Sequence, residues 1–420
     1  MANPDITAET DVLRTVDGQP LKAALTRASR RARIRAFFLV VPLLIFVLLT
    51  FAVPIGQMLS RSFTDDKFSA NMVELGAWFD ANGDTAPDEA AYAALAADLK
   101  TAAKSRTAGS IGTRVNYEIP GTRSLFTSTA RRADKLEPPY KGALLAANEK
   151  WGRPDIWAAM RSASAAATLN FYQAALDRQI GDSGKFEPAP ENSQIYVKLF
   201  IRTFVLSVVI TGLCLLLGFP VAHLLAVLPL RHASLLMILV LLPFWTSLLV
   251  RTTSWMVLLQ GQGVINDVLV SLGIVSEDGR LEMMYNQLGT IIAMTHILLP
   301  FMILPLYSVM KTIPPSYARA ARSLGATSWT TFRRIYLPQT VSGIGAGGIL
   351  CFILAVGYYI TPALVGGADG TLISNQIAFH MQKSLNWSLA AALASMLLAA
   401  VLILYWAYDR IIGIDNMKLG

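Results

Sequence analysis

Residues 316–338 read SYARAARSLGATSWTTFRRIYLP, a polar and basic segment between two long apolar runs. Pro314 and Pro315 lie just before this segment and are expected to break the preceding helix. Ser316 is a candidate cap for a new helix, because its hydroxyl can accept from a free backbone N–H. We therefore predict a short helix over 317–324.

Gly325 is predicted to end that helix, because glycine alone turns the chain sharply without steric cost. Thr327 or Ser328 is expected to start a second short helix through Ile335, and Leu337-Pro338 to stop it. Two short helices joined by a glycine turn have a shape suited to docking into the cleft of a partner.

The composition predicts a polytopic membrane protein with some soluble mass. The 420 residues are 54% hydrophobic and 15% charged, with a mean hydropathy of +0.46. The net charge of +8 does not indicate nucleic-acid binding, because its excess lies mostly at the ends of apolar runs, where basic residues orient membrane proteins. Both cysteines, Cys214 and Cys351, fall within apolar runs, so no disulfide framework or metal-ligand spacing is present.

The first apolar run, 36–60, is long enough to cross a bilayer and too long for the core of a signal peptide. It follows a basic run in the tail 1–35, which we expect to be cytoplasmic. Residues 61–194 are polar, rich in alanine and without a spanning run, so they are predicted to be a periplasmic insert. Helices are expected at 88–104 and 154–178, and Trp78, Trp151 and Trp157 are expected in its core more than as a ligand platform.

Five further spans are predicted in a membrane core at 195–413, followed by a cytoplasmic tail at 414–420. The fold class expected is therefore an all-α polytopic membrane protein with six transmembrane helices and a large, mainly helical extracytoplasmic insert between the first two. The loop 311–340 is assigned to the cytoplasm, with both termini. The five spans are placed at 197–228, 233–260, 287–310, 341–365 and 388–410.

The spacing within the basic segment resembles the coupling motif of importer-type ABC transporter permeases, E-A-A-x-x-x-G-x9-I-x-L-P. Arg319-Ala320-Ala321 precede Gly325 by the family's interval, and Ile335, Leu337 and Pro338 follow nine residues later. Arg319 departs from the family, which has glutamate there, so an ion pair made by that glutamate does not carry over. An ordinary basic loop on the inner side is the alternative, but it does not require this fixed spacing.

A second set of motifs resembles the branch of these permeases that serves spermidine and putrescine importers, with the type I importer fold. It comprises Pro-Phe-Trp-Thr at 243–246, Val-Arg-Thr at 250–252 and Asn-Trp at 386–387. The resemblance implies a multi-pass subunit of the bacterial inner membrane. It covers 36–60 loosely and 196–410 well, and the insert at 61–194 is not part of that branch's usual pattern.

The resemblance also implies the partners: a second permease subunit, two ABC ATPase subunits and a periplasmic substrate-binding protein. The chain has no G-x-x-x-x-G-K-[ST] loop, so we expect no catalytic residue and no cofactor in this chain. ATP and Mg would be bound by the partner ATPase, and no metal site is expected here. The residues assigned to ATPase coupling are Ser316, Tyr317, Arg319, Ala320, Ala321, Gly325, Ala326, Ile335, Leu337 and Pro338.

Candidate pathway residues come from the polar and aromatic positions in and beside the spans. Polyamines are cations, and aromatic faces or carboxylates are the groups that bind them. Arg251 lies in mid-run and would repel a cation, so we expect it to be structural or paired with an acidic neighbour. The residues assigned to the pathway are Trp245, Thr246, Arg251, Trp255, Asn266, Asp267, Tyr358, Tyr359 and Asp369.

Two other classes of function remain as alternatives. A self-contained secondary transporter would be expected to place an acidic or cation-binding residue at mid-membrane, and none is visible in spans two to five. A membrane receptor with a periplasmic sensor domain would need an output domain, and the predicted cytoplasmic segments are too short for one. An amino-acid-derived or sugar-like solute is left open beside a polyamine.

Overall fold

The computed structural model describes residues 21–83, 85–165, 167–181 and 185–412. The predicted tail 414–420 and most of the tail 1–35 lie outside these ranges. Within them, the chain is mainly helical and divides into two units, Met1–Ser60 and Arg61–Gly420, which are described separately.

The first unit is a single run of helix. It consists of α1 (Leu21–Val47), a π-helical turn (Leu48–Ala52) and most of α2 (Val53–Arg61). The stretch Ser29–Arg61 is apolar and long enough to cross a membrane, and it contains the span predicted at 36–60. A helix suits this environment because it satisfies its backbone hydrogen bonds internally.

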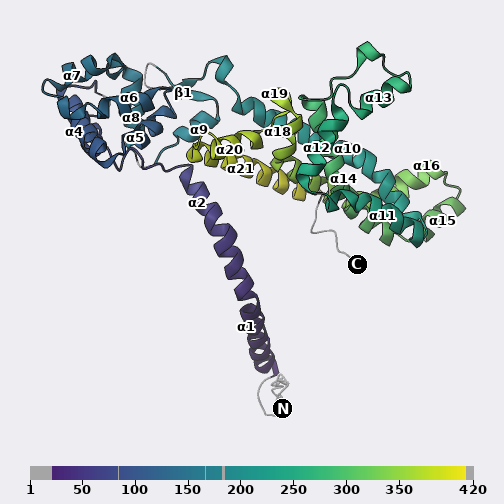
Figure 1. Cartoon of the computed structure of the whole chain (residues 1–420). Coiled ribbons are helices and arrows are strands. Elements are labelled where there is room, and N and C mark those ends of the chain that lie inside the picture. Colours follow the sequence, from purple (N-terminus) through teal and green to yellow (C-terminus); the bar gives the residue numbers. More distant parts are fainter. Residues whose placement is uncertain (1–20, 84, 166, 182–184, 413–420) are drawn as a thin grey trace, which may run out of the picture. The chain divides into compact units, whose positions relative to one another are not determined.

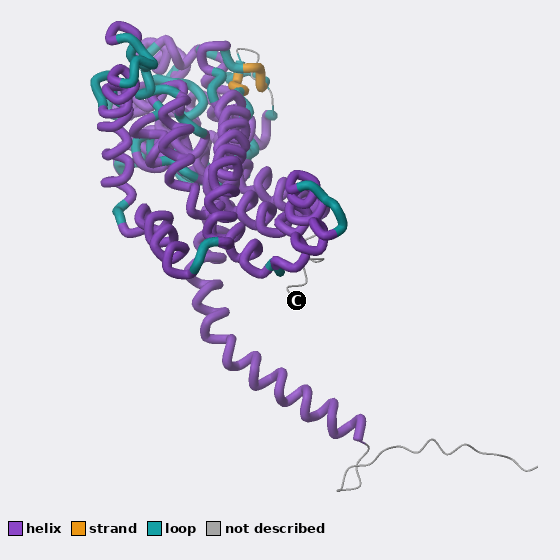
Figure 2. The backbone as a smooth tube through the Cα atoms, turned by 90° about the vertical axis from the view of Figure 1, so that its right-hand side faces the viewer, coloured by secondary structure: helices purple, strands orange, loops and turns teal. Residues whose placement is uncertain are grey.

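The second unit begins with the insert, whose helices surround one apolar core (Figure 1). Two short antiparallel strands, orange in Figure 2, pair Gln179 with Glu187. The insert's helices and strands are α3 (Val73–Asn82), α4 (Glu89–Ser105), α5 (Ala108–Asn116), α6 (Thr122–Ala130), α7 (Tyr140–Ala147), α8 (Pro154–Ser164), α9 (Asn170–Ala175), β1 (Arg178–Ile180) and β2 (Phe186–Pro188).

The insert's core is organised around tryptophan, as expected. Trp151 and Trp157 are buried, and Trp78 packs against the same cluster half-buried. The Trp151 carbonyl oxygen accepts from the Trp157 Nε1–H at 2.7 Å and from the Tyr92 hydroxyl at 3.1 Å. These bonds matter because a buried polar group without a partner is costly.

One predicted helix of the insert is confirmed and one is wrong. The helix expected at 88–104 is α4, and the Asp88 carboxylate caps it by accepting from the Ala91 N–H at 2.9 Å. The single helix expected at 154–178 is instead divided into α8, α9 and β1. The chain leaves α8 because it pairs with the start of the insert, where the Thr168 N–H donates to the Phe63 carbonyl oxygen at 2.7 Å.

The membrane core follows in chain order. Its main helices are α10 (Tyr196–Val227), α11 (Leu230–Trp245), α12 (Leu248–Leu259), α13 (Val264–Ser271), α14 (Gln287–Thr312), α17 (Leu337–Gly357), α20 (Ile373–Gln382) and α21 (Trp387–Ile412). Short helices lie between them: α15 (Pro315–Ser323), α16 (Ser328–Thr331), α18 (Ile360–Val365) and α19 (Gly367–Gly370). Helices α10, α14 and α17 pack on one another around a second apolar cluster.

The glycines of α17 are needed for this packing at two positions. A Cβ on Gly347 would lie 2.8 Å from the Met302 Sδ atom of α14, and a Cβ on Gly343 would lie 3.1 Å from the Val309 Cβ atom. Small residues let membrane helices approach this closely. Gly348 and Gly357 have open space instead, so close packing explains part of the glycine content and not all of it.

Five helices of the described chain are long and apolar enough to cross a membrane, or six when one bent pair counts as a span. The spans expected at 197–228, 287–310 and 388–410 correspond to α10, α14 and α21. The span expected at 233–260 is not one straight helix, because α11 and the α12–α13 stretch bend by 100° at Thr246-Ser247. The span expected at 341–365 begins earlier, at Ser328, and its helix ends at Gly357.

Candidate functional site

The first short helix of the basic segment is α15, and a glycine turn ends it. Gly325 has φ +85°, in the left-handed region that favours glycine. Its N–H donates to the Arg322 carbonyl oxygen at 2.9 Å, and the Ala326 N–H donates to the Ala321 carbonyl oxygen at 3.0 Å. These two bonds are the Schellman pattern that satisfies the last carbonyls of a helix.

The start of α15 differs from the prediction. The helix begins at Pro315, with Pro314 at the capping position and no side chain capping it. Ser316 is therefore inside the first turn and is not the cap. Proline suits this place because the first-turn N–H groups have no partner within the helix.

The second short helix starts as predicted and ends differently. The Thr327 hydroxyl accepts from the Thr330 N–H at 3.2 Å and so caps α16. The predicted stop at Leu337-Pro338 is wrong, because the chain continues from α16 through a π-helical turn (Phe332–Tyr336) into α17. Pro338 lies in the first turn of α17, and the wider π-helical turn before it accommodates its missing N–H.

Most of the residues assigned to ATPase coupling are exposed, and three are buried or half-buried. Leu324, beside the turn, is 90% exposed, Trp329 is 68% exposed and Tyr317 is 52% exposed. Ser316, Arg319, Ala320, Gly325, Ile335 and Pro338 are also exposed, whereas Ala321 is buried and Ala326 and Leu337 are half-buried. The segment therefore presents large apolar side chains and basic residues to its surroundings, while Ala321 holds it against the core.

Two aromatic residues that the sequence reasoning missed hold this segment on the end of α10. The Tyr336 hydroxyl is 2.9 Å from the His223 Nδ1 atom, and the Phe332 ring meets the Phe219 ring edge-on at 6.0 Å between centroids. Both lie in the π-helical turn. The π-helical turn of the segment is thereby packed against α10.

Four of the pathway candidates lie at the bend between α11 and α12 or along α12. Trp245 is 74% exposed at the end of α11. The Arg251 guanidinium donates to the Thr246 carbonyl oxygen at 3.0 Å and to its Oγ1 atom at 3.4 Å. Arg251 therefore braces the bend, as a structural residue. Trp255 donates from Nε1 to the His296 Nδ1 atom at 3.0 Å, which ties α12 to α14.

Asn266, another pathway candidate, has a side chain that is fully buried and bonded to backbone. Its amide nitrogen donates to the carbonyl oxygens of Gln260 and Leu281 at 3.2 and 3.0 Å. Its amide oxygen accepts from the Leu281 N–H at 2.9 Å. Asn266 thus closes the loop that runs from α12 past α13.

Asp267, the next residue, is exposed and paired with a base. Its carboxylate lies 2.7 Å from the Arg280 guanidinium, which also contacts Glu277 at 2.8 Å. These hydrogen bonds, first with Asp267 and then with Glu277, raise the pKa of Arg280. Arg280 therefore stays charged and offsets the charge of Asp267.

The last three pathway candidates lie at the corner after α17. The Ser374 hydroxyl donates to the Tyr358 carbonyl oxygen at 2.6 Å, and the Asn375 amide donates to the Tyr359 carbonyl oxygen at 2.7 Å. The Tyr359 ring is partly exposed, whereas Asp369 is exposed and lies 3.8 Å from the Arg202 guanidinium. The nine candidates therefore occupy three places: the bend, the α13 loop and this corner.

A buried hydroxyl pair joins the first and third of these places. Thr252 of α12 and Thr361 of α18 are both fully buried, with their Oγ1 atoms 3.2 Å apart. The sequence contained one signal for this contact: Thr252 is a polar residue next to Arg251 within an apolar run. Among the described residues, no group of three or more His, Cys, Asp or Glu side chains that could hold a metal ion is found.

A mutation tests the structural assignment of Asn266. Asn266→Ala removes three hydrogen bonds of a fully buried side chain, each contributing about 0.5–1.5 kcal/mol to stability. We expect a lowered midpoint of thermal unfolding for the purified subunit. Asp267→Asn is the matched control, because an exposed ion pair contributes about 0–1 kcal/mol. Equal shifts in the two variants would contradict the assignment.

Comparison with known proteins gives the family of the membrane core. Residues 196–412 match the profile of the binding-protein-dependent transport system inner membrane component. The spermidine/putrescine transport system permease protein PotB of Escherichia coli K12 is 34% identical over 222 residues, covering 52% of this chain and 80% of PotB. PotB of Haemophilus influenzae is 34% identical over 225 residues, covering 54% and 78%.

A third relative is the inner membrane ABC transporter permease protein YdcU of Escherichia coli K12. It is 33% identical over 230 residues, covering 51% of this chain and 71% of YdcU. The insert at 61–194 lies outside the matched profile, whereas the bend, the glycine turn and α21 lie within it. The chain therefore belongs to the family of binding-protein-dependent transport system inner membrane components, the permeases of ABC importers.

Proposed function

We propose that this chain is a permease subunit of an ATP-driven importer. With a second permease it forms the pathway for a polyamine such as spermidine or putrescine, or a related small polar organic solute, delivered by a periplasmic binding protein. Two ATPase subunits bind ATP and Mg and dock on the segment 315–336. The single observation that supports this best is that segment: an exposed two-helix element with a left-handed glycine turn, within the family match.

The proposed topology has six spans, both termini in the cytoplasm and the insert in the periplasm. The bent pair α11 and α12–α13 counts as the third span. Basic residues support this orientation, because Arg319, Arg322, Arg333 and Arg334 gather on the segment assigned to the inner side. A chain so oriented places the coupling segment within reach of cytoplasmic ATPases.

The polyamine assignment is supported by the names of the PotB relatives. Exposed aromatic rings at Trp245 and Tyr359 offer faces that attract organic cations. Arg280 offsets the charge of Asp267, so Asp267 is a weak cation ligand in this arrangement. We therefore propose that the rings of Trp245 and Tyr359 are the groups that contact a cation as it passes.

Reconstitution tests the proposal. The chain is co-purified with its candidate second permease and ATPase, placed in liposomes, and supplied with the binding protein and labelled spermidine. We expect uptake that requires ATP and the binding protein, with no uptake by this chain alone. Ion-gradient-driven uptake by the isolated subunit would favour a secondary transporter and contradict the proposal. Competition by putrescine, amino acids and sugars then ranks the solutes.

A further inference from the structure

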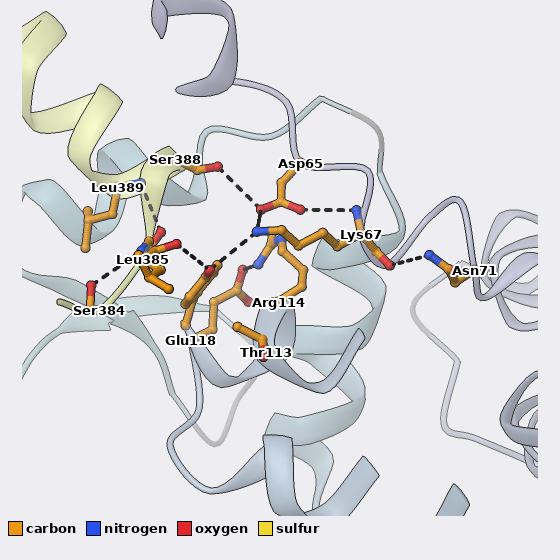
Figure 3. Close-up of polar contacts among 12 residues, drawn as sticks. Asp65, Lys67, Asn71, Thr113, Arg114, Glu118, Ser384, Leu385, Ser388 and Leu389 are labelled. Carbon is orange, nitrogen blue, oxygen red and sulfur yellow. Dashed lines mark hydrogen bonds and ion pairs between the residues drawn. The ribbon is translucent and has the colours of Figure 1, made fainter. Parts of the chain in front are cut away.

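The insert holds the outer end of α21 through hydrogen bonds that come from three parts of its chain. The Asp65 carboxylate lies 3.4 Å from the Ser388 hydroxyl (Figure 3). The Tyr117 hydroxyl donates to the Leu385 carbonyl oxygen at 3.2 Å. The Tyr172 hydroxyl lies 2.8 Å from the Ser395 hydroxyl. Ser388 and Ser395 are seven residues apart, so they lie on the same face of α21 two turns apart.

The Asp65 and Tyr117 contacts form a connected network through Lys67. Asp65 accepts from the Lys67 N–H at 3.1 Å, and its carboxylate lies 3.4 Å from the Lys67 ammonium (Figure 3). The same ammonium lies 3.4 Å from the Tyr117 hydroxyl. The Asp65 side chain is almost fully buried. A buried carboxylate in this position is stable only while its partners stay in place, so the network favours one fixed geometry.

The corner before α21 carries backbone strain, and the insert binds the strained residue. Leu385 has φ +54°, a conformation that costs a non-glycine residue free energy. Its carbonyl oxygen is the acceptor for the Tyr117 hydroxyl. The same bond therefore fixes the orientation of a strained peptide at the point where the chain enters α21.

An apolar contact lies beside the hydrogen bonds. Phe171 and Ala175 of α9 pack with Leu389, Ala392 and Leu393 of α21, and Leu199 of α10 and Ile373 of α20 complete the cluster. All these side chains are buried. The insert thus contacts α21 through both hydrogen bonds and buried apolar side chains. Such a contact favours movement of the insert and α21 as one body.

We propose that the insert is a clamp that keeps the outer end of α21 and the α20–α21 corner fixed during transport. Asp65, Tyr117 and Tyr172 are its positioning residues. The proposal rests on the proposed importer function for its transport readout. It assigns a role to a segment that lies outside the family match.

Disulfide trapping tests whether the clamp stays closed during transport. Asp65→Cys with Ser388→Cys joins the insert to α21. We expect ATP-driven uptake by the cross-linked protein to stay within about twofold of that of the same protein in the reduced state. Wild-type protein treated with the same oxidant is the control, because Cys214 and Cys351 are buried.

A loss of uptake of more than about tenfold on cross-linking this pair would overturn the clamp. A complex in which wild-type protein shows no ATP-driven uptake contradicts the importer function instead. Thermal unfolding still tests the clamp in that case.

A double-mutant cycle supplies the readout that is independent of transport. Asp65→Ala and Ser388→Ala are each expected to lower the unfolding midpoint by about 2–4 °C, and the double variant by less than their sum, because both remove the same contact. Additive shifts would contradict a direct contact. Tyr172→Phe supplies a test in the transport assay. We expect this variant to lower the maximal rate of uptake. The concentration of loaded binding protein that gives half of the maximal rate should stay unchanged. A change in that concentration alone would assign Tyr172 to docking of the binding protein and overturn its positioning role.

Discussion

Gly325→Val is expected to abolish transport while leaving the subunit inserted in the membrane. A Cβ at Gly325 would meet no atom within 4 Å, so the substitution causes no clash. The effect comes from the backbone, because a β-branched residue at φ +85° costs about 1–3 kcal/mol of strain. The turn would relax to another conformation and move α15 relative to α16. ATP-driven uptake in liposomes would measure the loss, which we expect to exceed about tenfold.

Gly325→Asn is the matched control for this prediction. Asparagine adopts the left-handed region more readily than other residues with a side chain. We expect this variant to keep most of the uptake, although its side chain is larger than hydrogen. Equal loss in both variants would show that the space around Gly325 matters and not its backbone conformation. Normal uptake in Gly325→Val would refute a coupling role for the turn.

Leu324→Asp is expected to weaken the association with the ATPase without destabilising this subunit. Leu324 is 90% exposed and lies beside the glycine turn, so the folded chain gains little from its packing. In the assembled transporter, we expect it to be a buried anchor, and replacing such an anchor with a charge costs about 2 kcal/mol or more. Co-purification and a titration of ATPase binding would show an affinity about thirtyfold lower.

Val73→Asp in the insert is the control for an exposed apolar residue replaced by a charge. Val73 is 62% exposed and lies far from the coupling segment in sequence. We expect its ATPase binding to equal that of the wild type. Unchanged binding in Leu324→Asp would remove Leu324 from the docking surface. A lowered unfolding midpoint in that variant would show that Leu324 packs within the subunit.

Local chemistry was sufficient to predict several parts of the structure. The apolar runs of α10, α14 and α21 are long and bounded by polar residues, so their positions follow from length and hydropathy. The turn at Gly325, and a cap at Thr327 or Ser328, were predicted because each requirement involves only a few neighbouring residues, and the structure places the cap at Thr327. The spacing from Arg319 to Pro338 was enough to suggest the family, and the comparison over 196–412 shows it.

The errors occurred where distant residues decide the conformation. Pro338 was expected to stop a helix, but the π-helical turn anchored by Tyr336 and His223 lets the helix continue into α17. The sequence also contained no sign that Asn266 is buried, because its partners Gln260 and Leu281 hold it in the loop interior. No pattern local to either residue contains this information.

The sequence by itself determined that this chain crosses a membrane repeatedly and carries an exposed glycine-turned segment, because hydropathy, spacing and backbone preference act over short distances. Only the tertiary structure decided that the insert is fastened to the last long helix. Asp65 and Ser388 are separated by 323 residues in the chain, and neither residue type predicts the other. Their meeting depends on the packing of α9 against α21, which is a property of the whole fold.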